Sequence, residues 1–138
     1  MLQRISPQDA QRLILTQGYT YVDVRSIPEY EAGHPCGAVN VPLLHRGPAG
    51  MTPNPDFLGV VEGAFAKDAK LVVGCQGGGR SQRAADALIR AGYTQVVEQR
   101  AGFGGSRDPV EAGWQSAGLP VEAGAGGDHG YEALRAKK

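Results

Sequence analysis

The chain has 138 residues, which is enough for one domain with a buried core and too few for two independent ones. Its 14 basic and 14 acidic residues balance, and this neutrality argues against binding to nucleic acid or to an anionic membrane surface. Hydrophobic residues make up 41% of the composition, which is typical of a globular protein, and no apolar run approaches the roughly 20 residues that a membrane span requires.

Helix and strand signals alternate along the chain. Ser6 followed by Pro7 is typical of a helix start, Gly18 is typical of a helix end, and the apolar run from Leu71 to Val73 is the clearest strand. The sequence predicts helices between residues 6 and 18, 26 and 33, and 54 and 65, over 81–91, around 109–117 and over 131–136. Strands are predicted over 21–24, 38–41, 70–74 and 95–98. The segment 43–53 is predicted to be a surface loop. This alternation predicts an α/β domain with a mainly parallel sheet and helices on both faces.

The cysteines and histidines are few and scattered. Cys36 and Cys75 cannot form a disulfide framework or a four-ligand zinc site, and the three histidines show no metal-ligand spacing. The first residues lack the basic and apolar regions of a signal peptide. We therefore expect a cytoplasmic protein without a metal or another cofactor, in which Cys75 remains a thiol.

The segment that follows the 70–74 strand carries the chemistry. Cys75 opens a glycine-rich turn, and a helix is predicted to begin just after Arg80. Consecutive glycines let several backbone N–H groups point at one spot, and the helix adds its positive N-terminal end, so this loop would stabilise an anion or a thiolate. A buried structural cysteine is the plainer alternative, but it explains neither the glycines nor Arg80. The candidate site comprises Cys75 as nucleophile and Gln76, Gly77, Gly78, Gly79, Arg80 and Ser81 as substrate-binding residues.

Several motifs resemble those of one family. Cys75-x-x-Gly-x-Arg80-Ser81 is similar to the active-site loop of single-domain rhodaneses, the thiosulfate-type sulfurtransferases. Val22-Asp23-Val24-Arg25, Glu29-Tyr30 and the segment 33–42 resemble the family's N-terminal signature, and Trp114 with 118–121 resembles its C-terminal one. The resemblance covers about residues 5 to 122. It implies a five-stranded rhodanese-like domain over 1–122, followed by a glycine-rich tail over 123–138 that ends in a short helix.

The resemblance also implies a double-displacement mechanism. Cys75 takes the outer sulfur of thiosulfate or a similar small anionic donor as a persulfide, and a thiophilic acceptor such as cyanide, a thiol or a protein removes it. Arg80 would orient the donor, and Ser81 would cap the helix. Asp23 and Arg25 are expected to support the loops beneath the site through an ion pair or hydrogen bonds.

Two rival functions remain open at this point. A cysteine-dependent phosphatase or arsenate reductase carries a longer loop than the four residues that separate Cys75 from Arg80 here. A persulfide carrier or binding module without turnover fits the same residues.

Two departures from the family pattern also need the structure. Cys36 is expected to be a small buried hydrophobe, with a resolving thiol as the alternative. The glycine-rich stretch 102–105 lies farther from Trp114 than in relatives, which predicts a lengthened loop near the site.

Overall fold

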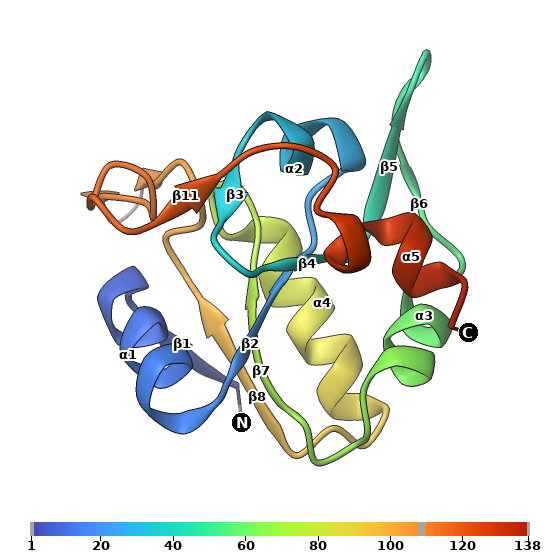
Figure 1. Ribbon diagram of the computed structural model, residues 1–138, viewed down its shortest axis with the longest axis horizontal. Helices are drawn as coiled ribbons and strands as arrows, with labels where there is room; N and C mark the ends of the chain where they lie inside the picture. The colour runs from blue at the N-terminus through green and yellow to red at the C-terminus, as the bar shows by residue number, and fades with distance from the viewer. Residues whose placement is uncertain (1, 108–109, 138) are drawn as a thin grey trace.

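The computed structural model describes residues 2–107 and 110–137, and the central feature of this part of the chain is a parallel sheet (Figure 1). Five strands lie in the order β1-β8-β7-β2-β4, and every neighbouring pair is parallel. The predicted α/β fold with a mainly parallel five-stranded sheet is confirmed. The strands are β1 (Gln3–Ile5), β2 (Thr20–Asp23), β4 (Val39–Asn40), β7 (Lys70–Gly74) and β8 (Gln95–Gln99).

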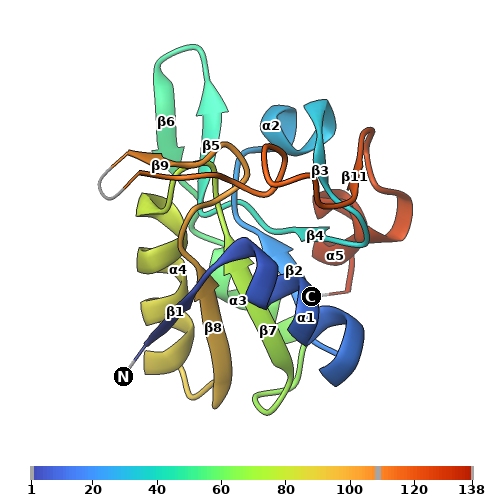
Figure 2. The same cartoon turned by 90° about the vertical axis from the view of Figure 1, so that its left-hand side faces the viewer.

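Helices cover both faces of the sheet, with α1 on one side and α4 on the other (Figure 2). Side chains alternate across a strand, so Leu71 and Val73 of β7 pack with α3, α4 and α5, while Val72 packs in a second core with Ala10 of α1. The central strand is therefore apolar on both faces, as its sequence indicates. The helices are α1 (Pro7–Gln17), α2 (Ile27–Ala32), α3 (Phe57–Ala64), α4 (Gly79–Arg90) and α5 (Tyr131–Arg135).

The prediction of a surface loop over 43–53 is wrong, because this segment forms an antiparallel hairpin. Strand β5 (Leu44–Gly47) pairs with β6 (Gly50–Pro53), and the hairpin projects from the body of the molecule (Figures 1 and 2). Gly50 has a φ of 98°, a left-handed conformation that suits the residue after the two-residue turn. Neither face of β6 is buried, so the hydrophobic alternation that reveals a strand is missing from the sequence.

The helix predicted around 109–117 is also wrong for the part that the structure describes, and Pro109 lies outside the described residues. Val110 is 87% exposed and begins β10 (Val110–Glu111), which pairs with β9 (Ser106–Arg107). In place of the helix, the backbone at Gly113 packs closely against the preceding loop. The approach is so close that a Cβ on Gly113 would lie 2.3 Å from the backbone nitrogen of Gly105. The remaining short elements are β3 (His34–Pro35), β11 (Val121–Glu122) and the 3₁₀ turn η1 (Gly127–His129).

The C-terminal segment packs onto the domain. The short terminal helix is confirmed as α5, whose Tyr131 and Leu134 are buried in the same core as α3 and α4. The Tyr131 hydroxyl also accepts a hydrogen bond from Nδ2 of Asn54. The division into a domain over 1–122 and a tail over 123–138 stays a prediction. Among the described residues, no helix is long and apolar enough to cross a membrane.

Candidate active site

The glycine loop joins the carboxyl end of β7 to the start of α4. Helix α4 begins at Gly79, and Gly78 is its N-cap with a φ of 106°. The prediction that Ser81 caps the helix is therefore wrong, because the glycines let the helix start two residues earlier. A Cβ on Gly78 would lie 2.6 Å from the carbonyl oxygen of Arg100, so no other residue fits there without strain.

Cys75 lies inside this loop with only 2% of its surface exposed. The backbone N–H of Gly78 donates a hydrogen bond to the Sγ of Cys75 at 3.0 Å. The Cys75 thiol in turn donates to the Oγ of Ser81 at 3.3 Å. The 102–104 segment fixes the loop from above, because the N–H groups of Phe103 and Gly104 donate to the carbonyl oxygens of Cys75 and Gln76. The predicted nucleophile thus lies where a backbone amide and a helix N-terminus meet.

Arg80 is held by a residue that the sequence analysis did not place in the site. Its Nη1 and Nη2 donate to Oε1 and Oε2 of Glu29 at 2.7 and 3.0 Å. Burial alone would raise the pKa of Glu29, but hydrogen bonds from Arg80 and Ser26 outweigh it and lower that pKa to about 2. Direct donor binding by Arg80 stays a prediction, since the fork of its guanidinium already binds a carboxylate. The capping-box pattern at Ser26 is the signal that could have drawn attention to Glu29.

Asp23 and Arg25 form the expected ion pair beneath the loop. The pair is buried, with Nη2 of Arg25 2.7 Å from Oδ2 of Asp23. Nη1 of Arg25 also donates to Oε1 of Gln76 at 3.0 Å, and the guanidinium stacks 4.5 Å from the ring centroid of Phe103. These contacts hold the side chain of the residue next to Cys75 in one orientation.

A second buried carboxylate lies on the other side of the loop. Glu98, in β8, has no exposed surface and accepts a hydrogen bond from Oγ of Ser81 at 2.6 Å and another from Nε of Arg4. Glu98 was not among the predicted site residues, and its only signal in the sequence is a carboxylate that follows two valines in the predicted strand 95–98.

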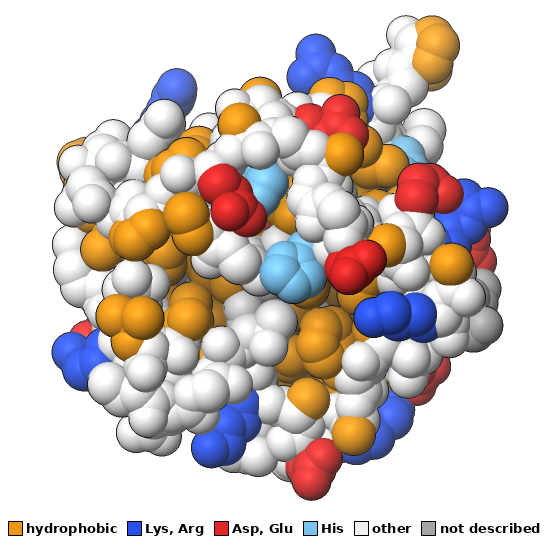
Figure 3. Space-filling view, viewed as in Figure 1, with side chains coloured by type: hydrophobic (Ala, Val, Ile, Leu, Met, Phe, Trp, Pro, Cys, Tyr) orange, Lys and Arg blue, Asp and Glu red, His pale blue; other side chains and the backbone are white. Residues whose placement is uncertain are grey.

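Two hollows open beside the loop and meet at Gln76. One of about 500 Å³ is lined by Arg25, Glu29 and Phe103, and the other, of about 470 Å³, by Gly77 and Arg107 among others. Gly104 and Gly105 also line the second hollow, so the glycine-rich stretch 102–105 lies near the site, as predicted. Elsewhere, Lys and Arg side chains are spread around the edge of the face in Figure 3.

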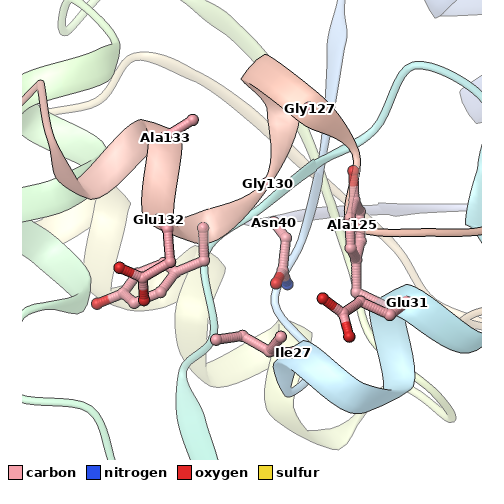
Figure 4. Close-up of a pocket in the computed structure, with 10 residues that line it drawn as sticks. Ile27, Glu31, Asn40, Ala125, Gly127, Gly130, Glu132 and Ala133 are labelled. Carbon is pink, nitrogen blue, oxygen red and sulfur yellow. The ribbon is translucent and has the colours of Figure 1, made fainter.

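A further hollow of about 170 Å³ lies between α2 and the C-terminal segment (Figure 4). Ile27 and Glu31 line it from α2, and Asn40 lines it from β4. None of the residues 75–81 is among its lining residues, so it is separate from the loop.

Comparison with known proteins places the chain in a family. The model of the rhodanese-like domain matches residues 6–105, which include the whole loop. The chain is a member of the rhodanese-like domain family. It is 42% identical over 110 residues to thiosulfate sulfurtransferase 16 of Arabidopsis thaliana, which is described as chloroplastic, covering 80% of this chain and 85% of that protein.

A second relative and a solved structure are also similar to the chain. The senescence-associated protein DIN1 of Raphanus sativus is 36% identical over 116 residues, which cover 84% of this chain and 59% of that protein. The crystal structure of Rv0390 from M. tuberculosis superposes with a TM-score of 0.74 at 26% identity, covering 88% of this chain and 98% of that one.

The second cysteine of this rhodanese-like domain is exposed, so the expectation of a small buried hydrophobe is wrong. Cys36 lies in the turn between β3 and β4, where its N–H donates to the carbonyl of Pro120 and Gly37 has a φ of 81°. The backbone of the turn is thus fixed while the thiol faces outward. A resolving role for Cys36 stays a prediction.

Proposed function

We propose that this rhodanese-like domain takes a sulfane sulfur from thiosulfate or a similar small anion onto Cys75 and passes it to a thiophilic acceptor. The observation that carries the proposal is the placement of the Cys75 sulfur at the N-terminal end of α4, where Gly78 donates a backbone hydrogen bond to it. Membership of the family supports sulfur transfer in general. The donor named here follows from the loop chemistry and from the name of the Arabidopsis relative.

In the first step the Cys75 thiolate attacks the outer sulfur of thiosulfate. A sulfur–sulfur bond to Cys75 forms while the bond inside thiosulfate breaks, and sulfite leaves with the bonding electron pair. In the second step cyanide, a thiol or a protein thiolate attacks the outer sulfur, and Cys75 leaves as a thiolate. The backbone N–H of Gly78 and the N-terminal end of α4 stabilise the negative charge on the Cys75 sulfur. Arg80 holds the end of the loop through Glu29, and the exposed Arg107 supplies positive charge at the mouth.

A persulfide carrier without rapid turnover is the second candidate, and the burial of Cys75 favours it over a phosphatase. Cys75 is only 2% exposed, so a small linear nucleophile reaches its sulfur more readily than a bulky phosphoester does. We also propose a cytoplasmic location, which rests on the sequence and which fractionation of cells that make the protein would test.

Intact mass spectrometry tests the proposal. Reduced protein is incubated with thiosulfate and then with cyanide, using the wild type, Cys75→Ser and the matched control Cys36→Ser. We expect the wild type and Cys36→Ser to gain one sulfur atom and to lose it to cyanide as thiocyanate, while Cys75→Ser gains nothing.

Three other outcomes are informative. Sulfur that is gained but not released to cyanide would favour the carrier. No gain in folded, reduced wild type would refute the thiosulfate reaction, and hydrolysis of an aryl phosphate instead would favour the phosphatase.

A further inference from the structure

The hollow between α2 and the C-terminal segment is formed where glycines of that segment pack tightly on α2. The N–H of Gly124 donates to the carbonyl oxygen of Glu31 at 2.9 Å, and a Cβ on Gly126 would meet the hydroxyl of Tyr30. Gly126 has a φ of 82°, in the left-handed region, which lets the chain turn above the Tyr30 ring. This turn and α2 together border the hollow of about 170 Å³.

Asn40 brings a hydrogen-bond acceptor without a donor to this hollow. The residue has no exposed surface, and its Nδ2 donates to the carbonyl oxygens of Asp23 and Arg25 at 3.0 and 2.9 Å. These two bonds fix the orientation of the amide, because a flipped amide would turn its oxygen against both carbonyl oxygens. Among the described residues, Oδ1 of Asn40 is buried and has no hydrogen-bond partner. Such a group costs free energy, so a donor that enters the hollow lined by Asn40 would be stabilised there.

The charged side chains around the hollow are acidic. Glu31 of α2 and Glu132 of α5 line it, and none of the described residues that line it is Lys, Arg or His. Figure 4 shows the carboxylate of Glu31 and the amide of Asn40 at the same hollow. Glu132 lies 3.7 Å from Arg135, and a pair between such exposed side chains is weak. The charge around the hollow therefore favours a cation.

We propose that this hollow binds a primary ammonium group on a short alkyl chain. One ammonium hydrogen is donated to Oδ1 of Asn40, and Glu31 and Glu132 supply the opposite charge. The alkyl chain packs against the apolar side chains of Ile27 and Ala125, which line the same space. The site does not involve the glycine loop and is independent of the proposed sulfur transfer.

The size and the composition of the hollow define this class of ligand. A volume of about 170 Å³ is well below the roughly 300–1,000 Å³ of sites for drug-sized molecules, so the alkyl chain is short. Tyr30 and Tyr131 also line the hollow, and aromatic side chains favour an organic cation. A metal ion fits less well, because the described part of the chain has no group of three or more His, Cys, Asp or Glu that could hold one.

Titration of the isotope-labelled full chain with n-propylammonium chloride, followed in amide NMR spectra at constant ionic strength, tests the proposal. We expect the side-chain amide signal of Asn40 to shift, because a hydrogen bond accepted by Oδ1 polarises the amide. The shift should saturate with a dissociation constant on the order of 1–10 mM. The backbone signals of Gly127 and Gly130, which line the hollow, should saturate at the same concentration.

Three matched probes separate the features of the ligand. Tetramethylammonium has the charge without an N–H donor, 1-propanol has a donor without the charge, and propionate has the opposite charge. Each should shift the Asn40 signal much less than propylammonium does at the same concentration. An equal shift with tetramethylammonium or 1-propanol would overturn the assignment of a primary ammonium, and an Asn40 signal that propylammonium leaves unchanged would overturn the site.

Carboxylate variants test the charge. Glu31→Gln should weaken propylammonium binding by roughly threefold to fivefold, and the double variant with Glu132→Gln by about tenfold or more. Glu62→Gln is the matched control, since Glu62 is 41% exposed and pairs with Lys67 outside the hollow, and it should leave the affinity unchanged. An unchanged affinity in the double variant, or an equal loss in Glu62→Gln, would contradict the proposal. Asn40 is kept in every variant, because its Nδ2 also holds the backbone after β2.

A last probe distinguishes two sources of the same ammonium group. Nα-acetyl-lysine methylamide carries it on a peptide, and binding as tight as that of propylammonium would identify a lysine side chain of a protein. Binding of propylammonium alone would identify a free amine, and both results support the site. The titrations contain no sulfur donor, so their outcome and that of thiosulfate loading are independent.

Discussion

The ion pair between Arg80 and Glu29 predicts a specific dependence of stability on pH. The Glu29 carboxylate accepts hydrogen bonds from Nη1 and Nη2 of Arg80 and from Ser26. These contacts lower the pKa of Glu29 from an ordinary 4.5 to about 2. A group whose pKa is lower in the folded state stabilises the fold above its unfolded pKa and loses that contribution as the pH falls through the folded value. The relevant window is therefore between about pH 4.5 and pH 2.

The full shift corresponds to roughly 3 kcal/mol, and because the Glu29 side chain is 20% exposed, screening by water reduces this to about 2 kcal/mol. Glu29→Gln should lower the free energy of unfolding by about 2 kcal/mol at pH 7 but by only about 1 kcal/mol at pH 3, where much of the wild-type advantage is gone.

Urea unfolding at both pH values measures this difference. Fluorescence of Trp114 reports the transition, because it is the single tryptophan of the chain and only 1% exposed. Glu132→Gln is the matched control, since Glu132 is 74% exposed and lies 3.7 Å from Arg135, and it should change stability little at either pH. A Glu29→Gln deficit of the same size at pH 7 and pH 3 would refute the reasoning.

Three further predictions follow from packing and charge. Gly78→Ala should destabilise the protein by about 2 kcal/mol or more and prevent sulfur loading, because its φ is 106° and the added carbon would meet a backbone carbonyl, whereas Gly79→Ala has open space and should stay within about 0.5 kcal/mol. Equal losses for the two in urea unfolding would contradict this explanation. Leu134→Ala should cost about 2–4 kcal/mol because Leu134 is 2% exposed, while Leu15→Ala, at 72% exposed, should cost little. A thermal melt that shows no difference would mean that α5 contributes little to the core. Arg107→Ala should raise the thiosulfate concentration for half-maximal loading by roughly threefold to tenfold at low salt, and an effect unchanged in high salt would argue against a role for its charge.

The sequence was sufficient to predict the strand–loop–helix unit that carries the nucleophile. Its signals are local, because the apolar strand 70–74, the consecutive glycines and the amphipathic helix follow one another directly along residues 70–91. The Asp23–Arg25 pair was also predictable, since the two residues are neighbours at the end of one strand. Only the helix start was placed too late, because a glycine N-cap leaves no side-chain signature.

Contacts between distant segments could not be predicted in this way. Arg4 and Glu98 are 94 positions apart and meet only because β1 and β8 are paired with that register. Likewise, the β9–β10 hairpin replaces a helix because Gly113 packs directly against Gly105, which helical periodicity around Trp114 cannot reveal. The missed parts of the site are therefore those that depend on sheet register and loop packing.

The charges around the loop leave only partial charges to stabilise the sulfur that Cys75 carries. Three arginine–carboxylate pairs surround the cysteine: Asp23 with Arg25, Glu29 with Arg80, and Glu98 with Arg4. Each pair is formally neutral, so the layer beneath the loop offers no uncompensated positive charge to a bound dianion. What remains for the reacting group is the backbone N–H of Gly78 and the positive end of α4, a set of partial charges that matches the single negative charge of a persulfide. Thiosulfate is itself a dianion, so we expect its sulfite end to stay at the mouth of the loop, beside the exposed Arg107, while only its outer sulfur reaches Cys75.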